Sequence, residues 1–207
     1  LDLIPILSYI FLKGRCRYCK NKISPLSFFI ELFTGILYMI AFYSFGLSLK
    51  LVLVILSISL TMIIFASDLS YLIIPDEVLL FFGVCFLILQ FFLKGPIGTF
   101  KMILSGIFLF SIMYLIMLLG NFLFKKESLG GGDIKLLFVI GLILEPLLGI
   151  IDIFLGSLIA LPVSLFLYHK NKEHVIPFGP FLLIAFLIII FSKTTENDIV
   201  NLILNFS

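Results

Sequence analysis

Two aspartates stand where long apolar stretches meet short polar breaks, and together they could act as an acid and a base. Asp68 follows the apolar run 51–67, and Asp133 follows the three glycines Gly130, Gly131 and Gly132. An ionisable side chain near the membrane interior is costly unless it is buried against protein or water, so each is a functional candidate. If the two carboxyls share one proton, the ionised one can deprotonate a water and the protonated one can support an oxyanion. Such a pair could hydrolyse an amide without a metal, serine or cysteine nucleophile.

Each aspartate also has a simpler interpretation. Asp68 could be an interfacial acid at the end of a span, which is tolerated at small cost. Asp133 could be the N-cap of a helix that starts after a glycine turn. Asp76 is the rival of Asp68 for the first role, although it follows Pro75 and could cap the next helix. Because membrane spans separate these residues, their spacing alone does not show that they meet.

Other residues could bind metal or hold a charge. Cys16 and Cys19 form a CxxC among basic residues, and His169 and His174 lie far away in the sequence. Two thiolates do not complete a four-ligand zinc site, so either a partial zinc site or two reduced cysteines without a ligand fits the pattern. Lys135 could hold a partner carboxylate or lie at the membrane interface, and we expect the interface.

The elements that position these residues are predicted to be membrane-spanning helices. The 207 residues are 62% hydrophobic and only 13% charged, which is outside the range of soluble domains. The apolar runs lack the alternation of a barrel strand and predict an all-α, polytopic transmembrane helix bundle. About seven candidate spans are expected: 27–46, 49–66, 77–93, 102–123, 134–148, 150–168 and 177–192.

The basic residues predict the orientation of this bundle. When the breaks are assigned alternately to the two sides, four of the 14 Lys and Arg residues (Lys50, Lys94, Lys101 and Lys193) fall on one side. The remainder lie on the side of the three aspartates, and such an excess of Lys and Arg marks the cytoplasm. The formal net charge of +2 gives no electrostatic support to a nucleic-acid partner.

Four segments together resemble the type IV prepilin peptidases, which are GxGD aspartyl intramembrane proteases. In order, they are GRCRYCKNKIS followed by IELFTG, then SDLSYLIIPDEV, GGGDIKLLFVIGL and IPFGPFLL. The resemblance implies an endopeptidase of the bacterial inner membrane that removes the basic leader of prepilins or pseudopilins at the cytoplasmic face, cutting just before a hydrophobic helix. It implies Asp68 and Asp133 as the catalytic pair, with the three glycines shaping the active-site loop, and no cofactor for the peptidase reaction.

The resemblance also bears on a second activity and on the division of the chain. Many members also methylate the new amino terminus with S-adenosylmethionine, and their larger loop carries two CxxC pairs that bind zinc. Only the second pair matches here, so either a chain that begins inside a longer protein or a shorter, protease-only member would explain the difference. We expect a basic cytoplasmic loop at 1–26, a membrane-embedded peptidase domain at 27–192 and a short tail at 193–207.

Two other functions compete with this interpretation. A small carrier or channel coupled to protons or cations would place acids in mid-span, whereas Asp68 and Asp133 are expected at span ends and only Asp152 is a mid-span candidate. A catalytically silent scaffold would use the acids as helix caps and the basic loops to bind anionic membrane lipid. The four ordered motifs favour the peptidase.

Overall fold

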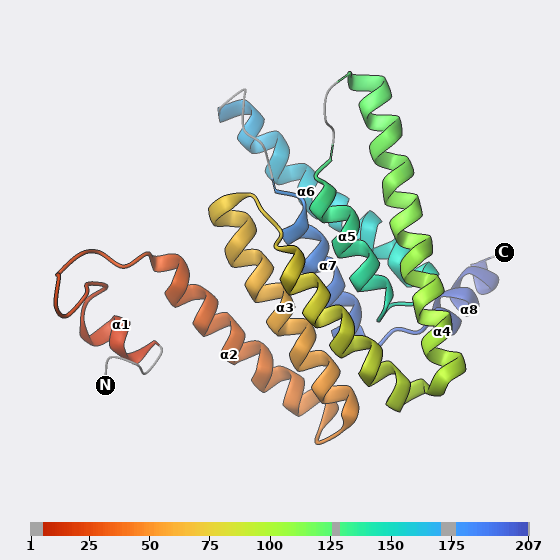
Figure 1. Cartoon of the computed structure of the whole chain (residues 1–207), viewed down its shortest axis with the longest axis horizontal. Helices are drawn as coiled ribbons and strands as arrows, with labels where there is room; N and C mark the ends of the chain where they lie inside the picture. Colours follow the sequence, from red (N-terminus) through yellow and green to blue (C-terminus); the bar gives the residue numbers. More distant parts are fainter. Residues whose placement is uncertain (1–5, 126–128, 171–176, 207) are drawn as a thin grey trace.

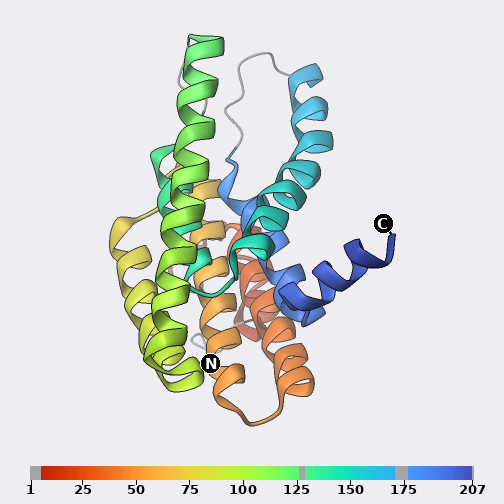
Figure 2. The same cartoon turned by 90° about the vertical axis from the view of Figure 1, so that its right-hand side faces the viewer.

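The computed structural model describes residues 6–125, 129–170 and 177–206, and the fold in these ranges is all-α as predicted. Its elements, shown in Figures 1 and 2, are α1 (Leu7–Phe11), α2 (Pro25–Phe45), α3 (Leu49–Tyr71), α4 (Asp76–Phe124), α5 (Gly131–Gly141), α6 (Pro146–Lys170), α7 (Gly179–Ser192) and α8 (Glu196–Phe206). Within the described ranges, four helices are long and apolar enough to cross a membrane, namely α2, α3, α4 and α6. The predicted count of seven spans is therefore not confirmed.

The predicted spans 77–93 and 102–123 lie on the single helix α4, which is sharply kinked. Gly95 has φ 70° and ψ −178°, a backbone conformation that glycine adopts without steric cost, and Pro96 follows it. A straight helix of 49 residues would be about 74 Å long. Instead the chain turns back, and residues 76–94 and 96–124 form two arms that run in opposite directions (Figures 1 and 2).

The predicted span 134–148 is wrong in extent, because α5 ends at Gly141 and α6 begins at Pro146. With 11 residues, α5 is about 16 Å long, roughly half the thickness of the hydrocarbon core. The carbonyls of the turn after α5 are satisfied by buried side chains from both arms of α4. Gln90 Nε2 donates to the Leu142 carbonyl at 3.0 Å, and Ser105 Oγ donates to the Leu144 carbonyl at 2.7 Å. Backbone groups can leave a helix inside a membrane protein only where such partners exist.

α5 packs unusually close to the second arm of α4. A Cβ atom added to Gly141 would lie 2.6 Å from the Cα atom of Gly106, and one added to Gly106 would lie 2.8 Å from the carbonyl oxygen of Phe138. Small residues at a helix contact let two backbones approach each other, which is how membrane helices gain packing energy. The kinked α4 therefore holds α5 in place along its length and at its C-terminal turn.

The main core joins α3, α4, α5 and α7. Its fully buried residues are Leu60, Ile64, Phe86, Leu136, Ile140, Leu142, Leu183 and Phe186. This core fixes the end of α3 and the beginnings of α4, α5 and α7 beside one another in the upper half of Figure 1.

Candidate active site

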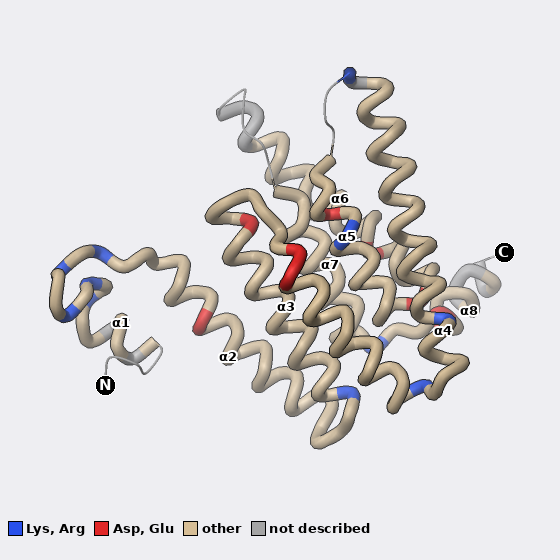
Figure 3. Tube along the Cα trace, viewed as in Figure 1, with Lys and Arg blue, Asp and Glu red and all other residues tan. Residues whose placement is uncertain are grey.

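A polar cavity of about 640 Å³ lies where the end of α3 meets the beginnings of α4, α5 and α7. Its lining residues include four acids and one base: Asp68, Asp76, Glu77, Asp133 and Lys135. Figure 3 shows the acidic positions of α3, α4 and α5 gathered in this part of the bundle. The structure thus brings Asp68, its rival Asp76 and Asp133 to one cavity, together with the three glycines of the predicted active-site loop.

Asp133 is held at the start of α5 by the glycine loop. The N-cap of this helix is Gly130, so Asp133 lies in the first turn and the alternative interpretation of Asp133 as the N-cap is wrong. Its carboxylate accepts hydrogen bonds from the backbone N–H groups of Gly130 and Gly179. The first of these bonds resembles half of a capping box, in which the third helical side chain reaches back to the N-cap. The Asp133 side chain is consequently buried with a fixed direction.

Two glycines of the loop, Gly131 and Gly132, differ in the space that surrounds them. A Cβ atom at Gly132 would lie 3.0 Å from the Cβ atom of Ile74, which packs directly on this position. A Cβ atom at Gly131 would have nothing within 4 Å. Position 132 therefore requires glycine, because the link between α3 and α4 packs directly against it. Position 131 has room for a side chain.

Asp68 is positioned by the turn that ends α3. Its backbone carbonyl accepts from the N–H of Leu72, whose left-handed conformation (φ 54°) reverses the chain. Ser67 Oγ donates to the Ile73 carbonyl at 2.8 Å and holds the link that follows. The carboxyl of Asp68 is thereby buried at the wall of the cavity.

Gly179, the first residue of α7, lies between the two carboxyls. A Cβ atom at this position would lie 3.0 Å from Asp68 Oδ2 and 3.2 Å from Asp133 Oδ1. The two carboxyl oxygens thus flank the same backbone position of α7, whose N–H group donates to the Asp133 carboxylate. The motif IPFGPFLL entered the prediction only through the resemblance, so the position of Gly179 beside both acids was missed. Its position between Phe178 and Pro180 was the one available signal.

Burial and the neighbouring Asp68 change the protonation behaviour of Asp133. Asp133 lies outside the four candidate spans, and its pKa is raised to about 7. Burial is the largest cause of this rise and the negative charge of Asp68 adds to it, while the hydrogen bonds from Gly179 and Gly130 oppose it. A carboxyl with such a pKa is partly protonated near neutral pH, which is the state that an acid in an acid and base pair requires.

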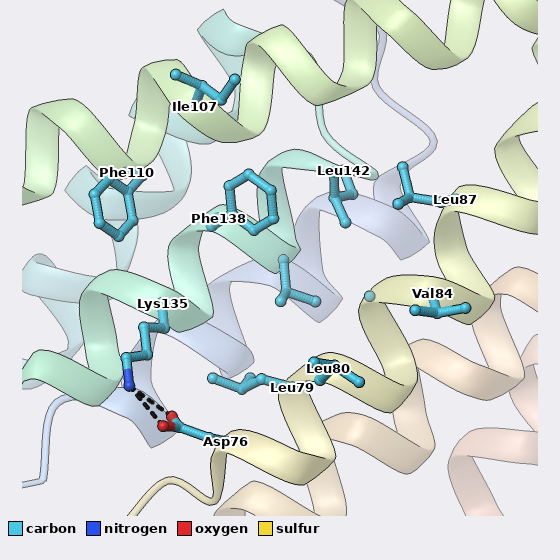
Figure 4. A pocket seen from close by; sticks show the side chains of 12 residues that line it. Asp76, Leu79, Leu80, Val84, Leu87, Ile107, Phe110, Lys135, Phe138 and Leu142 are labelled. Carbon is cyan, nitrogen blue, oxygen red and sulfur yellow. Dashed lines mark hydrogen bonds and ion pairs between the residues drawn. The ribbon is translucent and has the colours of Figure 1, made fainter.

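Asp76 lines the same cavity but is engaged differently. It is the first residue of α4, and the N-cap of this helix is Pro75, so Asp76 is not the N-cap. Instead, Lys135 Nζ lies 2.7 and 2.8 Å from the two Asp76 carboxylate oxygens, as Figure 4 shows. Lys135 therefore holds a partner carboxylate, which was the alternative to the interface position expected for it, and both side chains of the pair are exposed. The ion pair joins α4 and α5 through two residues that are 59 positions apart in the sequence.

The CxxC segment forms a tight turn near the N-terminus. Cys16 N–H donates to the Asn21 carbonyl, and the Cys16 carbonyl accepts from Lys20. Within the described ranges, no three His, Cys, Asp or Glu side chains are grouped so that they could hold a metal ion. Two cysteines do not meet the four-ligand requirement of structural zinc, so these residues do not fit a zinc centre. His174 lies outside the described residues.

The fold and this cavity define a polytopic helical membrane protein with buried carboxylates at one end of its bundle. The model of the type IV leader peptidase family matches residues 53–165, and that of the bacterial peptidase A24 N-terminal domain matches residues 1–45. The chain therefore belongs to the type IV leader peptidase family, as the resemblance predicted. No solved structure matches it significantly.

Curated relatives carry the name prepilin leader peptidase/N-methyltransferase. The Bacillus subtilis protein is 36% identical over 150 residues, which are 69% of this chain and 55% of the relative. The Neisseria gonorrhoeae protein is 33% identical over 94% of this chain and 66% of its own length. The Vibrio cholerae protein is 32% identical over 92% of this chain and 76% of its own length. The chain thus spans little more than half of the Bacillus relative and about two thirds of the Neisseria relative.

Proposed function

We propose that this chain is an aspartyl endopeptidase of the bacterial inner membrane that cleaves the basic leader from prepilins or pseudopilins. The observation that carries this proposal is that Asp68 Oδ2 and Asp133 Oδ1 lie within 3.0 and 3.2 Å of one point, the position that a Cβ atom of Gly179 would take. It places two buried carboxyls on one small backbone group at the wall of one cavity. The names of the curated relatives support the substrate class.

Asp133 is assigned the proton in the resting pair, because burial raises its pKa to about 7. Asp68 is assigned the ionised form. In the first step, Asp68 takes a proton from a water whose oxygen attacks the scissile carbonyl carbon, and Asp133 gives its proton to the carbonyl oxygen. In the second step, Asp68 donates its new proton to the leaving amine as the C–N bond breaks. Asp133 recovers a proton from the hydroxyl, and both carboxyls return to their starting states.

Asp76 is assigned a structural role and not a catalytic one. Both of its carboxylate oxygens accept hydrogen bonds from Lys135 Nζ. A carboxylate neutralised by a lysine is a poor partner for sharing a proton. Asp68 therefore remains the preferred first member of the pair.

The lining of the cavity supports a basic leader as the bound segment. Four acids and only one base line it, so it attracts a peptide that carries Lys or Arg. The surplus of Lys and Arg on the aspartate side of the sequence supports a cytoplasmic location of this end.

N-methylation of the new amino terminus from S-adenosylmethionine is a second proposed activity, supported by the names of the relatives. A carrier function has one residue in its favour, Asp152 in α6, whose two carboxylate oxygens are buried without a partner in the described part of the chain. Asp152 does not line the cavity that holds the aspartate pair, and we therefore retain the peptidase.

The test is cleavage of a peptide with a basic leader and a following apolar helix by the full chain in lipid vesicles. Mass spectrometry should show one cut at the border between the two parts, and Asp133→Asn should abolish it while the protein still folds. Absence of a cut by the intact chain, or an unchanged rate for Asp133→Asn, would contradict the proposal.

A further inference from the structure

A second cavity, of about 620 Å³, lies between the two arms of α4 and α5 (Figure 4). Leu79, Val139 and Leu142 are buried in its floor, while Val84 and Ile107 are about half exposed on its two sides. The only charged residues that line it are Asp76 and Lys135, which form the ion pair at one end (Figure 4). We call this feature the α4 groove. It is an apolar surface with a polar entrance.

The α4 groove is continuous with the candidate active site. Asp76 and Lys135 line both the polar cavity and the groove. From this ion pair the polar cavity extends to Asp68 and Asp133, and the groove extends along α4 and α5 to Leu87 and Leu142. A peptide that crosses the ion pair therefore passes directly from acidic to apolar surroundings.

We propose that the α4 groove binds the apolar helical segment that follows the scissile bond of the substrate. This inference rests on the proposed function. A peptide cut between a basic leader and an apolar helix must present the two parts to different surroundings within a few residues. The acidic cavity matches the leader in charge, and the groove beside it matches the apolar segment.

The shape of the groove explains why a helix would prefer it to lipid. Lipid tails are as apolar as leucine, so helices associate in membranes through close packing and not through the hydrophobic effect. A recessed floor between two raised walls lets side chains of an incoming helix interdigitate. Gly83 contributes to this recess, because it lines the groove without a side chain.

Paired tryptophan substitutions test the proposal. Ile107→Trp fills the groove, whereas Leu104→Trp on the same arm does not, since Leu104 is absent from its lining; both residues are 49% exposed. Val84→Trp has a similar control in Ile88→Trp, with exposures of 49% and 52%. We expect the groove variants to lower kcat/KM by about tenfold, mainly through KM, and the controls to stay within about twofold. Equal effects of groove and control variants would overturn the proposal.

Photocrosslinking supplies a readout that does not depend on turnover. Benzoylphenylalanine at position 107 or at 104, in the Asp133→Asn background, is irradiated with the leader peptide in vesicles. A crosslink to the apolar part of the peptide from position 107 and not from 104 is expected. Crosslinks only to lipid, or only to a second copy of the chain, would overturn the proposal even if a tryptophan variant fails to fold. Failure of the intact chain to cleave, by contrast, would refute the proposed function.

Discussion

Replacement of Gly179 by alanine is the sharpest perturbation of the site that leaves both acids in place. The added Cβ atom would lie 3.0 Å from Asp68 Oδ2 and 3.2 Å from Asp133 Oδ1, and 3.1 Å from Ile74 Cδ1. Ordinary contact begins at 3.4 Å, so the two carboxyl oxygens must retreat by 0.4 and 0.2 Å or α7 must shift. The φ of Gly179 is not in the left-handed region, so the effect would come from space and not from backbone strain.

The expected result follows from how sensitive catalysis is to position. A displacement of about 1 Å can cost about a hundredfold in rate, so shifts of a few tenths of an ångström at both acids should lower kcat by about tenfold. KM should change little, because the alanine does not line either wall of the α4 groove. The loss of stability from overpacking should be about 1–3 kcal/mol.

The assay is kcat and KM for the leader peptide, with Gly131→Ala as the matched control. A Cβ atom at Gly131 has nothing within 4 Å, so this variant introduces the same change in the neighbouring loop without crowding the acids. Thermal unfolding in detergent reports on the fold of both. An unchanged kcat for Gly179→Ala, or an equal loss for Gly131→Ala, would refute the inference that the two acids are held around Gly179.

Three further predictions concern pH, packing and buried charge. Because the pKa of Asp133 is raised from 3.8 to about 7, cleavage should fall as pH rises through about 7, and the folded state should lose stability as pH rises from about 4 to about 7; Asp133→Asn should remove this part of the stability profile. Gly141→Val should lower the unfolding midpoint strongly, because its side chain would meet the backbone of Gly106, whereas Gly35→Val has no atom to meet within 4 Å. Asp152→Leu should raise the midpoint, since both buried oxygens lack a partner in the described ranges; a lower midpoint would show that Asp152 is satisfied in the membrane.

Much of the fold could be predicted from the sequence, because apolar length and charge placement are local properties. The extent of α5 could not be predicted. The sequence stays apolar through the turn after Gly141. The turn can be buried because Gln90 and Ser105, which are distant in the sequence, donate hydrogen bonds to its carbonyls. A window of apolar residues cannot distinguish such a turn from a continuing helix.

In the candidate site, too, some features could be predicted from the sequence and others could not. Its acids and glycines could be predicted from their types and motifs, and the structure places them at one cavity. The pairing of Lys135 with Asp76 could not be predicted, since it depends on how α4 and α5 lie side by side. The position of Gly179 beside both acids could not be predicted either, because the side chains that face a glycine depend on how the helices pack.

The measurement that tests the central claim most directly is the cleavage rate of the leader peptide by Asp68→Asn, Asp133→Asn and Asp76→Asn, each checked for its fold. We predict that the first two variants lose cleavage while Asp76→Asn retains it, because Asp76 is bonded to Lys135 and takes no part in proton transfer. Retained cleavage by folded Asp68→Asn or Asp133→Asn would contradict the assignment of the pair, and loss in Asp76→Asn with activity in Asp68→Asn would transfer the first role to Asp76.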